Sequence, residues 1–205
     1  MGSLPTATPC LISMLPIRVL RLVVVALAVV AIACGDPTKP KPTFLSSANA
    51  YTLYPLQGSP PATNNAILFL GGATRASGSF QFDVALDLDA TGKAVVYPVR
   101  LLAGTIAGTV KRVGLQPVAG SFSALQIVPD KGYDTLTAQV VSPGTVLAVE
   151  LQDVGTCQFS RGGSLIYAKF VVDSINATSR RIFARAVVDP NCGYREVVQD
   201  SLPNS

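Results

Sequence analysis

Apolar and polar residues alternate along much of the chain after residue 44, a pattern typical of β-strands with one buried face. The clearest example is 79–89, SFQFDVALDLD, in which one face carries Phe80, Phe82, Val84, Leu86 and Leu88. The other face carries Asp83, Asp87 and Asp89 together with Gln81 and Ala85. We expect that polar face to be solvated, as in an antiparallel sheet that faces water on one side.

Three turn signals separate pairs of such segments and predict hairpins. The segment pairs are 79–89 with 94–102, 135–141 with 145–152, and 165–175 with 181–189. Inside the 94–102 segment, Pro98 indicates an edge position or a bulge, because proline cannot donate to a ladder. Further strands are expected at 49–54, 66–70, 106–112 and 120–128.

The same stretch of chain shows no convincing helical period. The fold class is therefore predicted to be all-β, an antiparallel β-sandwich, with a β-barrel as the alternative. The predicted organisation is a signal peptide at 1–33, a linker at 34–47, a single β-domain at 48–200 and a tail at 201–205.

The N-terminal region follows a different pattern. An uncharged apolar run at 22–33 is preceded by Arg18 and Arg21. As a helix these residues would span roughly 18 Å, less than the roughly 30 Å of a bilayer core. The basic front, short run and small-residue end predict a cleaved secretory signal, and Met14 is an alternative start. An uncleaved anchor is the remaining alternative.

The run ends in Ala31-Ile32-Ala33-Cys34, which resembles the lipobox of bacterial lipoproteins, although Leu is usual at the position of Ala31. The resemblance implies a diacylglyceryl thioether on Cys34 and acylation of its amine after cleavage. It places the protein in the bacterial cell envelope, bound to a membrane through Cys34. Gly35, not Asp, follows the cysteine, which favours the outer membrane. The same bond is also an ordinary signal-peptidase site, so a secreted or periplasmic soluble protein is the alternative.

The sequence contains four cysteines, namely Cys10, Cys34, Cys157 and Cys192. Removal of the signal and lipidation of Cys34 leave one possible pair. If the last hairpin turns near Ala177, Cys192 lies opposite about residue 163, close to Cys157. A Cys157–Cys192 disulfide is expected, and a two-cysteine metal site or two buried thiols are the alternatives.

Composition excludes several kinds of chemistry. The chain has no histidine, so Ser-His-Asp and Cys-His catalysis are ruled out. The net charge is +4, and the basic residues are scattered and do not form a dense face. We expect no nucleic-acid partner and no cofactor.

Two groups of residues are candidate sites. Asp87, Asp89 and Thr91 begin like a calcium loop, but the same residue types are usual in a hairpin turn. Asp87 and Asp89 could also form an acid–base pair, against the simpler interpretation of a solvated strand face. Tyr133, Tyr167 and Tyr194 could stack on sugar rings, although strand tyrosines usually pack in the core with the hydroxyl toward water.

The functional prediction is a membrane-anchored, non-enzymatic binding or structural module, whose protein or glycan partner the residues do not specify. An apolar-ligand carrier with a barrel cavity is one alternative. A hydrolase using Asp and Glu is another, although Glu150 and Glu196 are the chain's only glutamates and form no evident pair.

Overall fold

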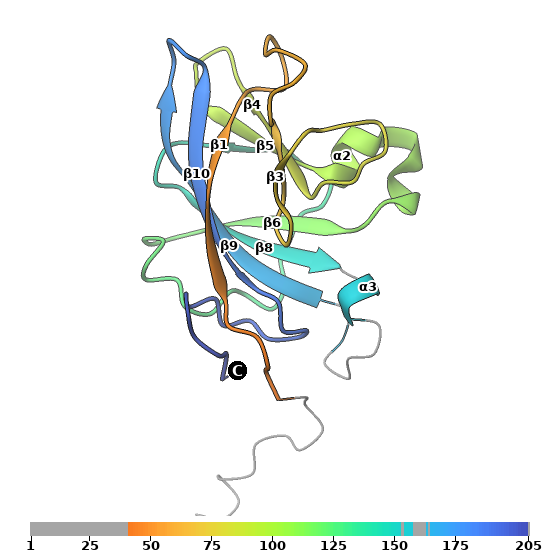
Figure 1. Cartoon of the computed structure of the whole chain (residues 1–205), viewed down its shortest axis with the longest axis vertical. Helices are drawn as coiled ribbons and strands as arrows, with labels where there is room; N and C mark the ends of the chain where they lie inside the picture. The colour runs from red at the N-terminus through yellow and green to blue at the C-terminus, as the bar shows by residue number, and fades with distance from the viewer. Residues whose placement is uncertain (1–40, 153, 158–162, 164, 205) are drawn as a thin grey trace, which may run out of the picture. The chain divides into compact units, whose positions relative to one another are not determined.

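The computed structural model describes residues 41–152, 154–157, 163 and 165–204, and most of its regular structure is β-strand. The strands form two separate antiparallel five-stranded sheets (Figure 1). Buried side chains from both sheets make up one core between them. The predicted β-sandwich is therefore confirmed, and the barrel alternative is not the fold.

The first sheet contains the longest strands, in the order β1-β10-β9-β8-β6. These strands are β1 (Ser47–Leu53), β6 (Val113–Val118), β8 (Val146–Gln152), β9 (Leu165–Asn176) and β10 (Arg181–Asp189). The predicted hairpin of 165–175 with 181–189 is confirmed, because β9 and β10 pair directly on either side of a short turn.

The second sheet has shorter strands, in the order β3-β2-β4-β5-β7. These strands are β2 (Ala66–Leu68), β3 (Gly72–Thr74), β4 (Val84–Leu88), β5 (Ala94–Pro98) and β7 (Gln139–Val141). Among the described residues, the helical segments are α2 (Val99–Ala103), the 3₁₀ helix η1 (Gly104–Thr109) and α3 (Val154–Cys157). They are too short to add a helical layer.

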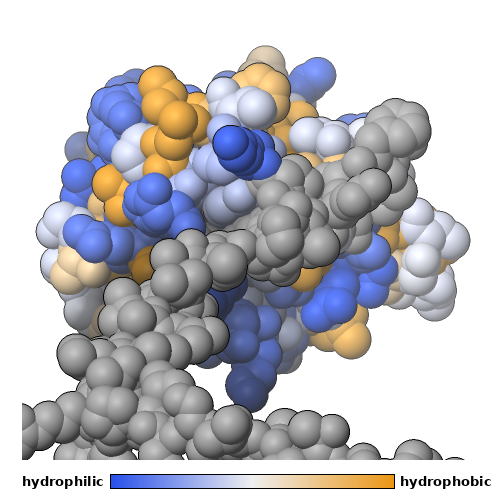
Figure 2. Space-filling model, turned by 90° about the horizontal axis from the view of Figure 1, so that it is seen from below, coloured by the Kyte–Doolittle hydropathy of each residue, from blue (hydrophilic) through white to orange (hydrophobic). Residues whose placement is uncertain are grey.

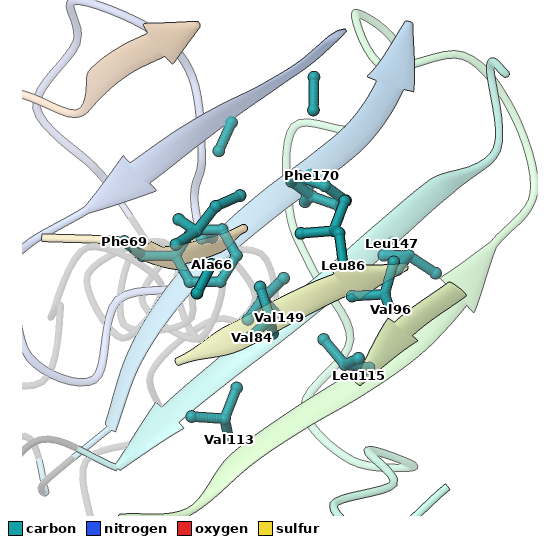
Figure 3. Packing of buried hydrophobic residues seen from close by; sticks show 14 of the residues in the cluster. Ala66, Phe69, Val84, Leu86, Val96, Val113, Leu115, Leu147, Val149 and Phe170 are labelled. Carbon is teal, nitrogen blue, oxygen red and sulfur yellow. The ribbon is translucent and has the colours of Figure 1, made fainter. Parts of the chain in front are cut away.

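The space between the sheets is filled by aliphatic and aromatic side chains (Figure 3). Phe69, from just beyond β2, meets Phe170 of β9 edge to face, with 6.1 Å between ring centroids. The alternating residues of the last hairpin lie in this core, namely Ile166, Ala168, Phe170, Val172, Ile182, Ala184, Ala186 and Val188. The period of two along β9 and β10 thus identified the inner face correctly.

The predicted hairpin of 135–141 with 145–152 is wrong. Its first segment supplies β7, which pairs with β5 in the second sheet. Its second segment supplies β8, which pairs with β6 and β9 in the first sheet. The Ser142-Pro143-Gly144 turn exists, with the Thr145 N–H donating to the Ser142 carbonyl, but it carries the chain from one sheet to the other. Local turn chemistry does not specify which strand the chain pairs with next.

Four other strand predictions need correction. The 79–89 segment is a strand only from Val84 to Leu88, because residues 79–83 form a turn and a bend in which Phe80 has a positive φ of 51°. The 94–102 segment is a strand only as far as Pro98, after which α2 begins. Pro98 is the last residue of β5 and pairs only with Val84 of β4, because β7 pairs with β5 no further than Val96; its other side is therefore a local edge, as predicted. The 106–112 segment lies largely in η1 and leads into β6, a strand that was not predicted. The 120–128 segment is irregular, with an isolated bridge from Ile127 to Glu196.

That irregular segment has a structural role, because it covers the outer face of the first sheet. Val128 and Val197 form a second buried cluster with Ala148, Tyr167 and Val187 of the sheet. The backbone joins the two covering segments, since the Val128 N–H donates to Arg195 and the Val197 N–H donates to Gln126. The middle of the first sheet, around Ala148, Tyr167 and Val187, is consequently buried on both faces, whereas the outer side of β1 is exposed.

The chain enters the domain and ends at the same end. The Ser46 N–H donates to the Ser201 carbonyl at 3.0 Å, so residues just before β1 lie beside the C-terminal segment. Figure 1 shows this end at the bottom and the β9–β10 turn at the top. We call the part formed by residues 41–46, 190–197 and 200–204 the lower end.

Candidate functional site

The disulfide prediction is confirmed, because Cys157 and Cys192 are bonded. The bond joins α3 to the segment that follows β10. The Gly193 N–H also donates to the Leu165 carbonyl at 2.8 Å, within a few residues of the register expected from the hairpin turn. The disulfide therefore fixes the end of the first sheet to α3.

The predicted lipidation site, Cys34, and the predicted signal peptide lie outside the described residues. Both stay predictions. Within the part of the chain that the structure describes, no helix is long and apolar enough to cross a membrane.

The most polar interior feature is an ion pair at Asp83, immediately before β4. Asp83 is only 3 % exposed, so the expectation that it lies on a solvated face is wrong. Its Oδ1 lies 2.5 Å from the Lys111 ammonium, and its Oδ2 accepts a 2.6 Å hydrogen bond from the Phe69 N–H. The Asp83 carbonyl also accepts from the Val99 N–H at the start of α2. One residue thus links β2, β4, α2 and the segment leading into β6.

Lys111 lies where three surface hollows meet. The first, of about 190 Å³, has apolar walls that include Leu68, Leu70 and Leu151. The second, of about 510 Å³, is lined by Arg100 and Gln152 and by the chain around η1. The third, of about 340 Å³, is lined by residues 78–81, polar and apolar, and by Ile106 of η1. We call these three hollows together the Lys111 cleft.

The Lys111 cleft contains groups that can contact a ligand. The Arg100 guanidinium donates to the Val110 carbonyl from Nε and Nη2, both at 3.3 Å, and still lines the largest hollow. Two cationic side chains, neighbouring amide and hydroxyl groups and an apolar wall can hold a polar or anionic ligand. Asp83 is held by Lys111 and two backbone groups, which leaves it in a structural role.

Of the Asp87, Asp89 and Thr91 group, Asp89 and Thr91 form a capped turn. The Asp89 Oδ1 accepts from Thr91 N at 2.8 Å, from Thr91 Oγ1 at 2.7 Å and from Lys93 N at 2.9 Å. The Thr91 hydroxyl is the first cause of the lowered pKa of Asp89, and the backbone N–H groups add to it. Among the described residues, no group of three or more metal-ligating side chains could hold an ion.

Asp87 lies outside the capped turn of Asp89 and Thr91. It is 5 % exposed, so the expectation of a solvated face is wrong for this residue too. The segment after β1 runs along β4, with the Leu56 N–H donating to the Leu86 carbonyl. The Gln57 N–H approaches the Asp87 Oδ1 at 3.4 Å. A loop from elsewhere in the chain thus covers the face that alternation alone assigned to water.

The two glutamates are held by different partners. Glu150 is buried on the outer face of β8, 3.3 Å from Arg112, and burial raises its pKa while Arg112 opposes the shift. The Glu196 Oε2 accepts from the backbone of Asn204 at 2.7 Å. The described contacts therefore do not unite them as an acid–base pair.

The three tyrosines do not form an exposed sugar platform. Tyr133 and Tyr167 lie in the outer cluster with their ring centroids 6.3 Å apart, and the Tyr133 hydroxyl donates to the Pro129 carbonyl. Tyr194 is buried beside the disulfide and lines a different hollow. Packing accounts for all three rings.

Sequence reasoning missed Lys111 and Arg100, the cations of the cleft. The sequence feature that could have pointed to Lys111 is its position directly before Arg112. Lys111 and Arg112 are consecutive in an extended segment, so their side chains project to opposite sides. Lys111 meets Asp83 at the rim of the core, and Arg112 meets Glu150 on the outer face.

Comparisons with protein-family models, with curated proteins and with solved structures found no match.

Proposed function

We propose that the protein is a bacterial envelope lipoprotein, anchored through acylated Cys34, whose β-sandwich acts as a non-enzymatic binding or structural module. The observation that carries the proposal is the filled core. Side chains from both sheets occupy the interior, with Phe69 against Phe170 at its centre, so the space a carrier would need is taken by the protein itself.

The charged groups support a binding role over a catalytic one. General acid–base catalysis needs groups that are free to exchange protons with a substrate. Asp83 is tied to Lys111, and Glu150 lies against Arg112. We propose the Lys111 cleft as the binding surface, for a polar or anionic ligand.

The anchor is tested by metabolic labelling with a fatty-acid analogue. Wild type and Cys10→Ala are expected to carry the label, and Cys34→Ala is expected to lose it. Absence of label on wild type, or label retained by Cys34→Ala, would refute the anchor.

The module is tested against the carrier alternative by titration with an uncharged apolar fluorescent probe, because a fatty-acid anion could also bind the cations of the Lys111 cleft. We expect no saturable binding, because the buried side chains of the two sheets pack against one another in one core. Stoichiometric, saturable binding to the mature protein would overturn the module in favour of a carrier.

A further inference from the structure

We propose that the lower end of the domain docks on the lipid bilayer that holds Cys34, with Phe44 and Leu45 inserted at the headgroup boundary. The inference rests on the proposed lipid anchor. It goes further, because an anchor alone leaves the domain free to rotate, whereas docking fixes which face points outward.

The apolar residues concerned are unusually exposed. Phe44 is 62 % and Leu45 is 57 % exposed, and Ile127 and Leu202 are also among the exposed large hydrophobic residues. Leu45 and Leu202 each adjoin one residue of the Ser46–Ser201 backbone hydrogen bond. Ile127 bridges to Glu196 on the same C-terminal segment. We call Phe44, Leu45, Ile127 and Leu202 the apolar rim.

The backbone at Phe44 is fixed although its ring is exposed. Asn191 is buried, and its Oδ1 accepts from the N–H groups of Thr43 at 2.8 Å and Phe44 at 3.1 Å. The Asn191 Nδ2 donates back to the Phe44 carbonyl at 2.6 Å. A preformed backbone that holds an aromatic ring toward solvent needs little ordering when the ring enters an apolar phase.

The distance to the anchor favours a bilayer as the occupant. Seven chain steps separate Cys34 from Lys41, which allows at most about 25 Å. Two of its residues, Pro37 and Pro40, are prolines, a composition typical of stiff linkers. A short tether holds the apolar rim near the membrane at high effective concentration, so even a weak contact is populated. Lys41, beside Phe44 in one surface hollow, adds attraction to anionic headgroups.

Figure 2 views the molecule from this end, and hydrophobic and hydrophilic residues are interspersed over the visible part of the face. Such a mixture suits a shallow contact with the membrane interface, where apolar side chains enter and polar ones stay among the headgroups.

The experiment uses the mature acylated protein in vesicles of phosphatidylethanolamine and phosphatidylglycerol. An environment-sensitive thiol probe is placed on Asn204→Cys, next to the apolar rim, or on Ala177→Cys, in the β9–β10 turn at the opposite end. With Cys34 acylated and Cys157 bonded to Cys192, the introduced thiol is the labelling site. Lipids with brominated acyl chains are expected to quench the Asn204 probe and to leave the Ala177 probe unchanged.

Phe44→Ser with Leu45→Ser should abolish quenching at the Asn204 probe. The matched control is Leu136→Ser with Val140→Ser, since these residues are each 58 % exposed but Val140 lies in β7, the edge strand of the second sheet, and Leu136 in the bend before it. Equal quenching of the two probes, or unchanged quenching in the Phe44 and Leu45 variant, would overturn docking.

Thiol labelling of the wild-type protein tests separately whether Cys34 is acylated. An acylated wild type takes no probe, and docking is then judged by the quenching alone. A wild type that reacts at Cys34 overturns the anchor, and docking with it.

Discussion

In the middle of the first sheet, in β8 and β9, both faces are buried, yet they are built differently. The inner face, represented by Leu147, Phe170 and Ala186, packs against a second sheet and is almost wholly apolar. The outer face is covered by the irregular segments 119–134 and 194–204 and includes Lys169 and Glu150. A second sheet satisfies its own backbone groups, whereas an irregular segment presents carbonyls that need donors.

Lys169 illustrates the consequence. Its ammonium donates to the Leu125 carbonyl at 2.7 Å and lies 4.8 Å from the centre of the Phe122 ring. Burial lowers the pKa of Lys169, and the nearby Arg185 lowers it further. On the outer face, charged side chains thus bind the covering loop that contains Phe122 and Leu125. On the inner face, the second sheet is held by apolar contacts alone.

The largest difference in lost stability is expected between Phe170→Ala and Phe122→Ala. Phe170→Ala removes a fully buried ring from between the sheets and should destabilise the domain by about 3–5 kcal/mol. Phe122→Ala removes a partly buried ring from the covering loop and should cost about 1–2 kcal/mol. Urea unfolding of the mature protein measures both. Equal losses would show that the outer cover contributes as much as the sandwich core.

The next contrast concerns Lys111 and Arg112, consecutive residues that serve opposite faces. Lys111→Met leaves the carboxylate of Asp83 buried without its cation and should cost about 2–3 kcal/mol. The Arg112 side chain is 46 % exposed, so Arg112→Met should change stability by less than about 1 kcal/mol. Thermal unfolding at neutral pH compares the stability of the two variants. A larger loss of stability for Arg112→Met would show that the Arg112–Glu150 pair contributes more than the Lys111–Asp83 pair.

The same contrast explains how much the sequence could predict. Alternation along β9 and β10 identified the core correctly, because both strands are long and pair with neighbours of the same period. Alternation at Asp83 and Asp87 predicted a wet face incorrectly, because covering residues such as Lys111 and Gln57 come from other parts of the chain. The alternation of apolar and polar residues predicts the local geometry of a strand. It does not indicate which irregular segment covers the strand's polar face.

The candidate site was unpredictable for a related reason. The Lys111 cleft forms where 78–81, the η1 region and the end of β8 meet, and no single segment carries a motif for it. The Cys157–Cys192 disulfide could be predicted, because the cysteine count left one possible pair and the hairpin turn placed Cys192 opposite about residue 163, close to Cys157.

An effect confined to high pH is expected on the inner face. Tyr51 is 4 % exposed, and burial, helped by the charge of Asp83, raises its pKa to about 12. The folded protein then keeps the proton above about pH 10, where the unfolded chain loses it. Stability is full below pH 10 and falls as pH rises toward 12, by up to about 3 kcal/mol.

Tyr51→Phe should lessen this alkaline loss, measured by urea unfolding across the alkaline range. At neutral pH it should change little, because the Tyr51 hydroxyl has no hydrogen-bond partner among the described residues. An unchanged alkaline profile in Tyr51→Phe would assign the loss to the outer-face tyrosines, Tyr133 and Tyr167, whose pKa values burial also raises.

The smallest change in stability is expected for Glu150→Gln. This substitution should stabilise the domain, whereas Lys111→Met should destabilise it. Because burial raises the pKa of Glu150, its neutral form suits the folded state better than its charged form. The resulting contribution is favourable at low pH and is lost as pH rises through the folded-state pKa. Glu150→Gln keeps an acceptor for Arg112 and removes the buried charge, so it should stabilise the domain at neutral pH by less than about 1 kcal/mol. The gain should vanish in acid, where Glu150 is itself protonated. A loss as large as that of Lys111→Met would mean that the outer face depends on its ion pair as strongly as the rim of the core does.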